Sequence, residues 1–161
     1  MPQIIRAQQE DWAQVREIRL RALTADPQAF GQDWQTESAY SEEQWRERID
    51  EAAWFLAIKD GEPIGVIITR WEADSPTNER EFQGMWVQQD FRKAGVAREL
   101  AESVFIWAKD DGADTVTLYV SPENMPAMSL YEDLGFSDTG DRWVVQDGEP
   151  DTAWIKLARA L

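Results

Sequence analysis

Two apolar runs, residues 53–59 and 64–71, lie close together in the middle of the chain. Between them stands Asp60-Gly61, a pair that favours a tight β-hairpin because both of its positions accept a positive φ. The pair therefore predicts two antiparallel strands. Any fold for this chain has to contain that hairpin.

The remaining elements follow from apolar periodicity and from the turn residues between the segments. We predict further strands over 3–7, 80–88, 115–120, 141–146 and 152–158, the last two as a hairpin across Asp147-Gly148. We predict helices over 10–24, 41–52, 94–112 and 124–134. The order β-α-α-β-β-β-α-β-α-β-β indicates an α/β (α+β) fold, in which four helices pack on a mixed central sheet of about seven strands. A single domain over 1–161 is expected.

Two of the predicted helices have recognisable ends. Asp26-Pro27 ends the first, since proline has no backbone N–H to donate and its ring does not fit inside a helix. Ser41 and Gln44 match a capping box, in which each side chain accepts the other residue's backbone N–H. The second helix is therefore expected to begin at Ser41.

The composition excludes several kinds of chemistry. The chain has no cysteine and no histidine, which removes disulfides, thiol nucleophiles, Cys/His zinc sites and a histidine base, and we expect no metal. A net charge of −15 argues against nucleic-acid binding, because phosphate backbones require clustered Lys and Arg. The acidity fits either a salt-rich cytoplasm or an ordinary acidic protein. No apolar run approaches the roughly 20 residues that cross a membrane, so a cytoplasmic protein is expected.

The segment Arg92-Lys93-Ala94-Gly95-Val96-Ala97 joins a predicted strand to a predicted helix. The first backbone N–H groups of a helix have no intrahelical partner, and together with the helix dipole they bind phosphate. Small residues at 94, 95 and 97 allow an anion to approach these amides, and Arg92, Lys93 and Arg98 add positive charge. Taken alone, the segment is equally typical of an ordinary helix start with solvated basic residues.

A second motif lies at a fixed distance from the first. Arg92-x-x-Gly95-x-Ala97 matches the Arg/Gln-x-x-Gly-x-Gly/Ala signature of the GCN5-related N-acetyltransferase (GNAT) superfamily. The segment Asn124-x-x-Ala127-x-x-Leu130-Tyr131-x-x-Leu134-Gly135-Phe136 resembles that superfamily's second motif. The predicted order of elements is also similar to the GNAT fold over nearly the whole chain. The resemblance implies an acetyl-CoA-dependent N-acetyltransferase, in which a primary amine attacks the thioester directly.

The resemblance also assigns residues to the cofactor. It implies contacts with acetyl-coenzyme A from three groups of positions: the strand residues Met85, Trp86 and Val87, the segment Arg92 to Arg98, and Asn124, Ala127 and Tyr131. The matching tyrosine of the family is the general acid that protonates the departing thiolate, which implies this role for Tyr131. Asn124 would contact the pantetheine arm, and it is also a good N-cap with proline in the first helical turn.

The general base is less well defined. Glu81 shares a strand face with Val87, and some GNAT members place their catalytic glutamate near this position. Glu79 is the alternative, and Asp33 or Glu37 in the loop between the first two helices could also reach an acceptor. Each of these carboxylates is alternatively a solvated surface group, the common fate of acidic residues in so acidic a chain.

The acceptor is expected to bind the segment between the first two helices. Trp34 would stack on it, while Asp33 and Glu37 would attract its positive charge. A small-molecule amine is the expected substrate. The alternatives are a protein or peptide N-acetyltransferase and a non-catalytic acyl-CoA-binding or regulatory domain. The resemblance to the family also implies a homodimer.

Overall fold

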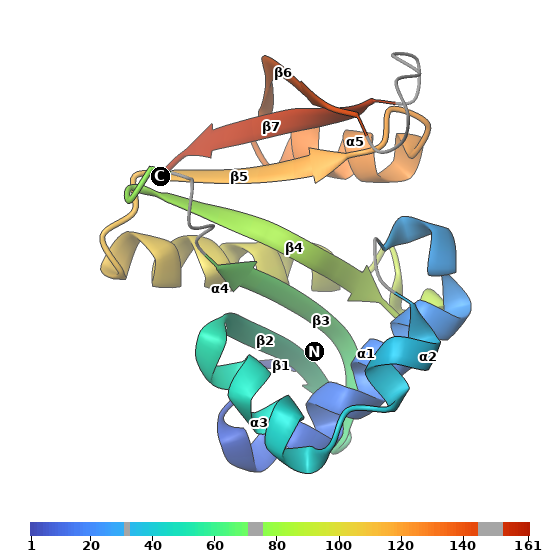
Figure 1. The fold of residues 1–161 in the computed structure, drawn as a ribbon. Coiled ribbons are helices and arrows are strands. Elements are labelled where there is room, and N and C mark those ends of the chain that lie inside the picture. The colour runs from blue at the N-terminus through green and yellow to red at the C-terminus, as the bar shows by residue number, and fades with distance from the viewer. Residues whose placement is uncertain (31–32, 71–75, 145–152) are drawn as a thin grey trace. The chain divides into compact units, whose positions relative to one another are not determined.

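A computed structural model describes residues 1–30, 33–70, 76–144 and 153–161 (Figure 1). Within these ranges, its strands are β1 Gln3–Arg6, β2 Ala53–Lys59, β3 Glu62–Arg70, β4 Glu79–Val87, β5 Thr115–Val120, β6 Ser137–Trp143 and β7 Trp154–Ala160. Its α-helices are α1 Trp12–Ala25, α2 Trp34–Ser38, α3 Glu42–Glu51, α4 Val96–Asp110 and α5 Met125–Asp133. The strands hydrogen-bond in the order β1-β2-β3-β4-β5-β7-β6. The predicted α/β fold with a mixed sheet is confirmed.

The chain forms two compact units, and β4 and α4 contribute to both. The N-terminal unit comprises Met1–Arg70 and Gly84–Ile106, and the C-terminal unit comprises Trp71–Gln83 and Trp107–Leu161. The single domain expected over 1–161 stays a prediction. Each unit is described by itself below.

The N-terminal unit is built around the hairpin of β2 and β3. The two strands pair antiparallel, with Phe55 opposite Ile67, and β1 pairs antiparallel with β2. Asp60 and Gly61 have φ values of 52° and 82°, as a two-residue turn of this kind requires. The hairpin prediction is confirmed.

Helices cover both faces of this hairpin. On one face, Val66 of β3 belongs to a core that also contains Ile18 of α1 and Trp45 of α3. Gly65 faces the other way, and a Cβ atom there would lie 3.2 Å from Leu100 of α4. Burial on both faces explains why the two strands read as continuous apolar runs and not as an alternating pattern.

The helix ends of this unit follow local chemistry. Asp26 ends α1 in a non-helical conformation with φ −134°, directly before Pro27. Ser41 and Gln44 form the predicted capping box, with hydrogen bonds of 2.8 and 3.2 Å. Helix α2 was not predicted, because its five residues are too few to show a helical period.

In the C-terminal unit, β5 joins parallel and antiparallel neighbours. Residues 79–82 of β4 pair parallel with 115–118 of β5, which pairs antiparallel with β7. At the end of α5, Phe136 packs edge-to-face between Phe82 and Tyr131, with ring centroids 5.6 and 5.7 Å away. This contact fixes α5 against the strands of its own unit.

The predicted start of the last hairpin was wrong. β6 begins at Ser137, not at 141, and its pairing with β7 shifts register between Asp138 and Arg142. All seven residues of β6 are exposed, so no alternation of apolar and polar residues marks the strand. The predicted turn Asp147-Gly148 lies outside the described residues.

Candidate functional site

The turn between β4 and α4 presents a row of backbone donors. The carbonyl of Gly95 accepts the N–H of Glu99 at 3.0 Å, and this is the first intrahelical bond of α4. The N–H groups of Val96, Ala97 and Arg98 therefore have no intrahelical acceptor. Val96 is buried and fixes the start of the helix to the core, while the residues before it are exposed.

The backbone of this turn is shaped for an approaching anion. Lys93 and Gly95 both have positive φ, 62° and 88°. A Cβ atom at Gly95 would meet nothing within 4 Å, so the space beside this residue is open. Lys93 and Arg98 are exposed and supply two positive charges beside it. Free amides at a helix start with flanking cations fit the pyrophosphate of coenzyme A.

Arg92 has two partners within the N-terminal unit. Its Nε donates to the carbonyl of Val87 at 2.8 Å, and its Nη2 donates to Asp26 Oδ2 at 2.9 Å. Trp86 Nε1 donates to the same carboxylate oxygen at 2.6 Å. The guanidinium therefore contacts the end of β4 and Asp26, and it stays partly exposed on the same turn as Lys93.

Asp26 is the common partner in this arrangement, although it was expected only to end a helix. The hydrogen bond from Trp86 is the largest influence on its pKa, which is lowered; burial acts in the opposite direction, and Arg92 adds to the lowering. An ionised Asp26 thus joins the end of α1, the end of β4 and the turn within the N-terminal unit. Its interest could not be read from the sequence, since Arg92 lies 66 positions away.

The strand residues expected to hold the acyl group come directly before this turn. Trp86 and Val87 are buried, with exposures of 6% and 7%, and Met85 is half-buried. The chain leaves the strand at Gln88, whose N–H donates to the carbonyl of Ile64 at 2.9 Å. The structure thus brings Met85–Val87 together with the turn at one end of β4 in the N-terminal unit.

In the C-terminal unit, α5 carries three predicted site residues on one face. Asn124, Ala127 and Tyr131 are spaced by three and four residues, which places them in line along a helix. Asn124 Oδ1 accepts the N–H of Ala127 at 3.2 Å, so Asn124 is the N-cap that its sequence context predicted. Burial raises the pKa of Tyr131 to about 12, which keeps the phenol protonated at neutral pH.

The two candidate bases lie on the part of β4 that belongs to this unit. Glu81 is half-buried and lies opposite Thr117 of β5. Glu79 is two residues earlier on the same face, with one carboxylate oxygen 3.8 Å from Lys156 Nζ. Nothing in this arrangement separates the two as bases.

The expected acceptor residues have three different surroundings in the N-terminal unit. Trp34 is exposed at 48% and can stack on a ligand. Asp33 caps α2 through Thr36, whose N–H donates to it at 2.8 Å. Glu37 was expected to attract an acceptor cation, but it is completely buried and bound to two arginines of the chain.

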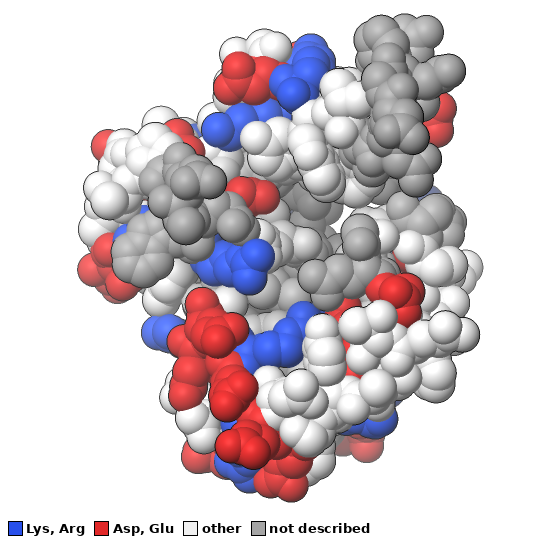
Figure 2. All heavy atoms as spheres, in the orientation of Figure 1, with Lys and Arg blue, Asp and Glu red and all other residues white. Residues whose placement is uncertain are grey.

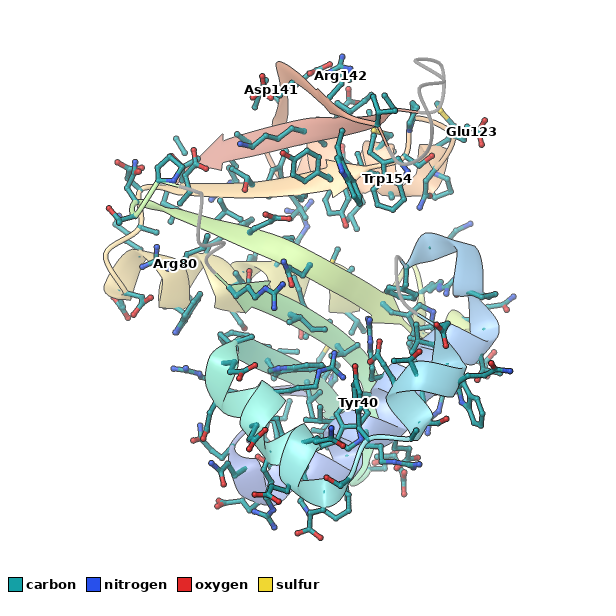
Figure 3. The ribbon with its side chains drawn as sticks, viewed as in Figure 1. Tyr40, Arg80, Glu123, Asp141, Arg142 and Trp154 are labelled. Carbon is teal, nitrogen blue, oxygen red and sulfur yellow. The ribbon has the colours of Figure 1, made fainter. Side chains whose placement is uncertain are left out.

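Glu37 is held by Arg19 of α1 and Arg48 of α3. Arg19 donates through Nε and Nη2 to both carboxylate oxygens, at 2.9 and 3.0 Å, and Arg48 Nη1 donates at 2.9 Å. Burial is the largest influence on the pKa of Glu37 and raises it, but the two guanidinium groups together outweigh burial and lower it. Tyr40 lies beside these groups, among the helices of this unit (Figure 3).

Acidic residues gather elsewhere on the N-terminal unit. Figure 2 shows acidic groups over α3, where the exposed carboxylates are Glu42, Glu43, Glu47, Asp50 and Glu51. Across the described ranges, no group of three or more His, Cys, Asp or Glu residues could hold a metal ion. No helix in the described part of the chain is long and apolar enough to cross a membrane.

Comparison with known proteins gives the family from the sequence. A family model described as "Acetyltransferase (GNAT) family" matches residues 12–136. An uncharacterised N-acetyltransferase of Methanocaldococcus jannaschii is 30% identical over 120 residues, which are 73% of this chain and 49% of that protein. The chain therefore spans about half the length of this relative.

Solved structures share the fold at low identity. A GNAT-family acetyltransferase from Streptococcus pneumoniae superimposes with a TM-score of 0.82 at 16% identity, covering 100% of this chain and 99% of its own. An acetyltransferase from Salmonella typhimurium, solved with its cofactor acetyl-CoA, has a TM-score of 0.79 at 15% identity, with coverage of 99% and 94%.

Proposed function

We propose that this chain, which belongs to the acetyltransferase (GNAT) family, transfers an acetyl group from acetyl-coenzyme A to a primary amine of a small molecule. The observation that carries the proposal is the turn before α4. Its three amides without an intrahelical acceptor, the open space at Gly95 and two exposed cations would form an anion site at the position of the family motif.

The cofactor end is assigned in each unit separately. In the N-terminal unit, the amides of 96–98 together with Lys93 and Arg98 would hold the pyrophosphate, and Met85–Val87 would offer backbone amides to the acyl group and the pantetheine. In the C-terminal unit, Asn124 and Ala127 would contact the pantetheine arm. The bound donor supplies an activated acyl group as a thioester.

The chain's own residues then have to move two protons. A base, Glu81 or alternatively Glu79, takes a proton from the amine directly or through water, because only the neutral amine is a nucleophile. Backbone amides of β4 stabilise negative charge on the acetyl oxygen as the C–N bond forms. Tyr131 gives its phenolic proton to the sulfur as the C–S bond breaks. The products are an amide and free coenzyme A.

Two measurements test the proposal. Acetyl-CoA at 100 times its Kd should stabilise the folded protein by about 2.7 kcal/mol, which raises the Tm of a chain of this size by roughly 5–10 °C. A panel of small amines should include one that releases free thiol faster than background hydrolysis. An unchanged Tm would contradict the cofactor assignment. If no amine in the panel releases thiol faster than background hydrolysis, that result would contradict amine transfer. The homodimer implied by the resemblance stays a prediction.

Replacing Gly95 with alanine tests whether the backbone geometry of the turn is needed to bind acetyl-CoA. We expect Gly95→Ala to lose about 1–2 kcal/mol of stability, because φ is +88° there, and also to weaken acetyl-CoA binding at least tenfold. Gly112→Ala is the matched control: it has φ +90° and equally open surroundings, but it lies beyond the other end of α4. The control should lose similar stability and keep its acetyl-CoA affinity by calorimetry. Equal affinities in the two variants would contradict the proposed role of the turn.

A further inference from the structure

The buried cluster of Arg19, Glu37 and Arg48 has more positive than negative charge. Two guanidinium groups share one carboxylate, so the cluster carries a net charge of +1 among its described members. The exposures of the three side chains are 6%, 0% and 22%. Aromatic rings beside both guanidinium groups stabilise part of this charge. A counter-ion would neutralise it.

One edge of the Arg19 guanidinium is not used by Glu37. Nε and Nη2 donate to the carboxylate, while Nη1 lies on the side of Gly84 in β4. A Cβ atom at Gly84 would lie 3.1 Å from Nη1 and 3.6 Å from the Phe30 ring. No acceptor for Nη1 is found in the part of the chain that the structure describes. Glycine at 84 therefore lets the Arg19 guanidinium lie directly against the backbone of β4, where any larger residue would crowd Nη1.

The surroundings of the cluster also lack acceptors. Three aromatic rings lie 4.7–5.3 Å from the Arg48 guanidinium, those of Tyr40, Trp45 and Trp54. Trp45 Nε1 is buried and finds no hydrogen-bond partner within the described ranges. The cluster thus has an excess of donors as well as an excess of positive charge, and both favour an anionic group.

We propose that the amine acceptor carries a carboxylate, as a free amino acid does, and that this carboxylate binds Arg19 Nη1 beside Gly84. This inference rests on the proposed function. Gly84 comes directly before Met85–Val87, the residues assigned to the acyl group, and neighbouring strand residues are about 3.4 Å apart. An acceptor held at Gly84 by its carboxylate would place a nearby amine next to those residues. Glu37 was expected to attract the positive charge of the amine, but it is already neutralised by Arg19 and Arg48.

The first test compares matched acceptors on the wild-type chain. A panel of amino acids with small, branched, aromatic and charged side chains is assayed beside the corresponding carboxamides, which keep the shape and lose the negative charge. We expect the best acid to exceed its amide at least tenfold in kcat/KM, because the amide oxygen carries no charge to pair with the guanidinium. The amide has the less basic amine, so intrinsic reactivity favours the opposite result.

Binding without turnover provides a second readout. Calorimetric titration of the same pairs into protein saturated with coenzyme A should show tighter binding of the acid by a similar factor. If the amide binds and reacts as well as the acid, or if no acid in the panel binds, the inference is overturned. Acetylation of amides and plain amines with no preference for acids would still support the proposed function, so the two failures are distinguishable.

Variants locate the effect in the cluster. Arg48→Gln removes the excess charge and keeps the Arg19–Glu37 pair, and Gly84→Ala places a methyl group against Nη1. Both should lower the ratio of acid to amide kcat/KM at least threefold. Arg46→Gln is the control, since it removes the same charge from an exposed pair with Glu42 on α3 and should leave the ratio unchanged. Taking the ratio within each variant cancels any loss of folded protein; an unchanged ratio in Arg48→Gln and Gly84→Ala would overturn the assignment.

Discussion

Tyr131→Phe is expected to lower kcat by about 100-fold or more and to leave acetyl-CoA binding almost unchanged. The variant keeps the ring that packs against Phe136 and loses only the phenolic proton. Because burial raises the pKa of Tyr131 to about 12, the phenol stays protonated across the usual assay range. Tyr131 should therefore cause no alkaline loss of turnover below about pH 11. A thiol-release assay measures kcat, and the acetyl-CoA-induced Tm shift measures cofactor binding.

Tyr119→Phe is the control for this result. Tyr119 lies on β5 of the same unit, where its ring contacts Trp143, and its loss of a hydroxyl should leave turnover unchanged. Full activity in Tyr131→Phe would remove the phenol from the mechanism. A loss of the acetyl-CoA-induced Tm shift in parallel with kcat would instead assign Tyr131 to cofactor binding.

The largest loss of stability is expected from Glu37→Gln. The change leaves Arg19 and Arg48 without an anion at a site where the carboxylate is fully buried, and breaking such a cluster costs about 3–5 kcal/mol. For a chain of this length the Tm should fall by on the order of 10 °C. Glu42→Gln is the control, because the exposed pair of Glu42 and Arg46 contributes about 0.3–0.5 kcal/mol. Similar melting temperatures for the two variants would contradict a structural role for Glu37.

The pH dependence of the same loss has a definite sign. The folded state lowers the pKa of Glu37 from its ordinary value of 4.5, so its contribution to stability is complete above that value. The contribution disappears as the pH falls through the lowered pKa, because the protonated side chain no longer pairs with the arginines. The difference in Tm between wild type and Glu37→Gln should therefore be constant near neutral pH and shrink in acid. A difference that grows in acid would contradict the pairing.

Features set by neighbouring residues were predictable from the sequence. The turn at Asp60-Gly61 and the capping box at Ser41 depend on residues within three positions of one another. Their geometry is therefore determined by the local sequence. The turn before α4 was found for the same reason. β6 was placed too late because its exposed residues show no period, and periodicity was the signal used for strands.

Features set by distant partners were not predictable. Arg92 was assigned to the phosphate turn from its motif, and its contact with Asp26, 66 positions away, could not be foreseen. Glu37 was taken for an open carboxylate because its partner Arg19 is 18 positions away. One signal was available: Arg19 follows Val15 by four residues, so it stands on the apolar face of α1, where a charge needs a buried partner.

Asp26 ends α1 and accepts hydrogen bonds from both Trp86 and Arg92. These three roles limit which residues can replace it. Glycine or asparagine would suit the end of a helix before proline. Neither supplies the anion that Trp86 and Arg92 share, and asparagine offers a single acceptor atom with no charge. A glutamate keeps the charge but moves it by one methylene from two fixed donors. Position 26 should therefore tolerate fewer residue types than its partial exposure would suggest.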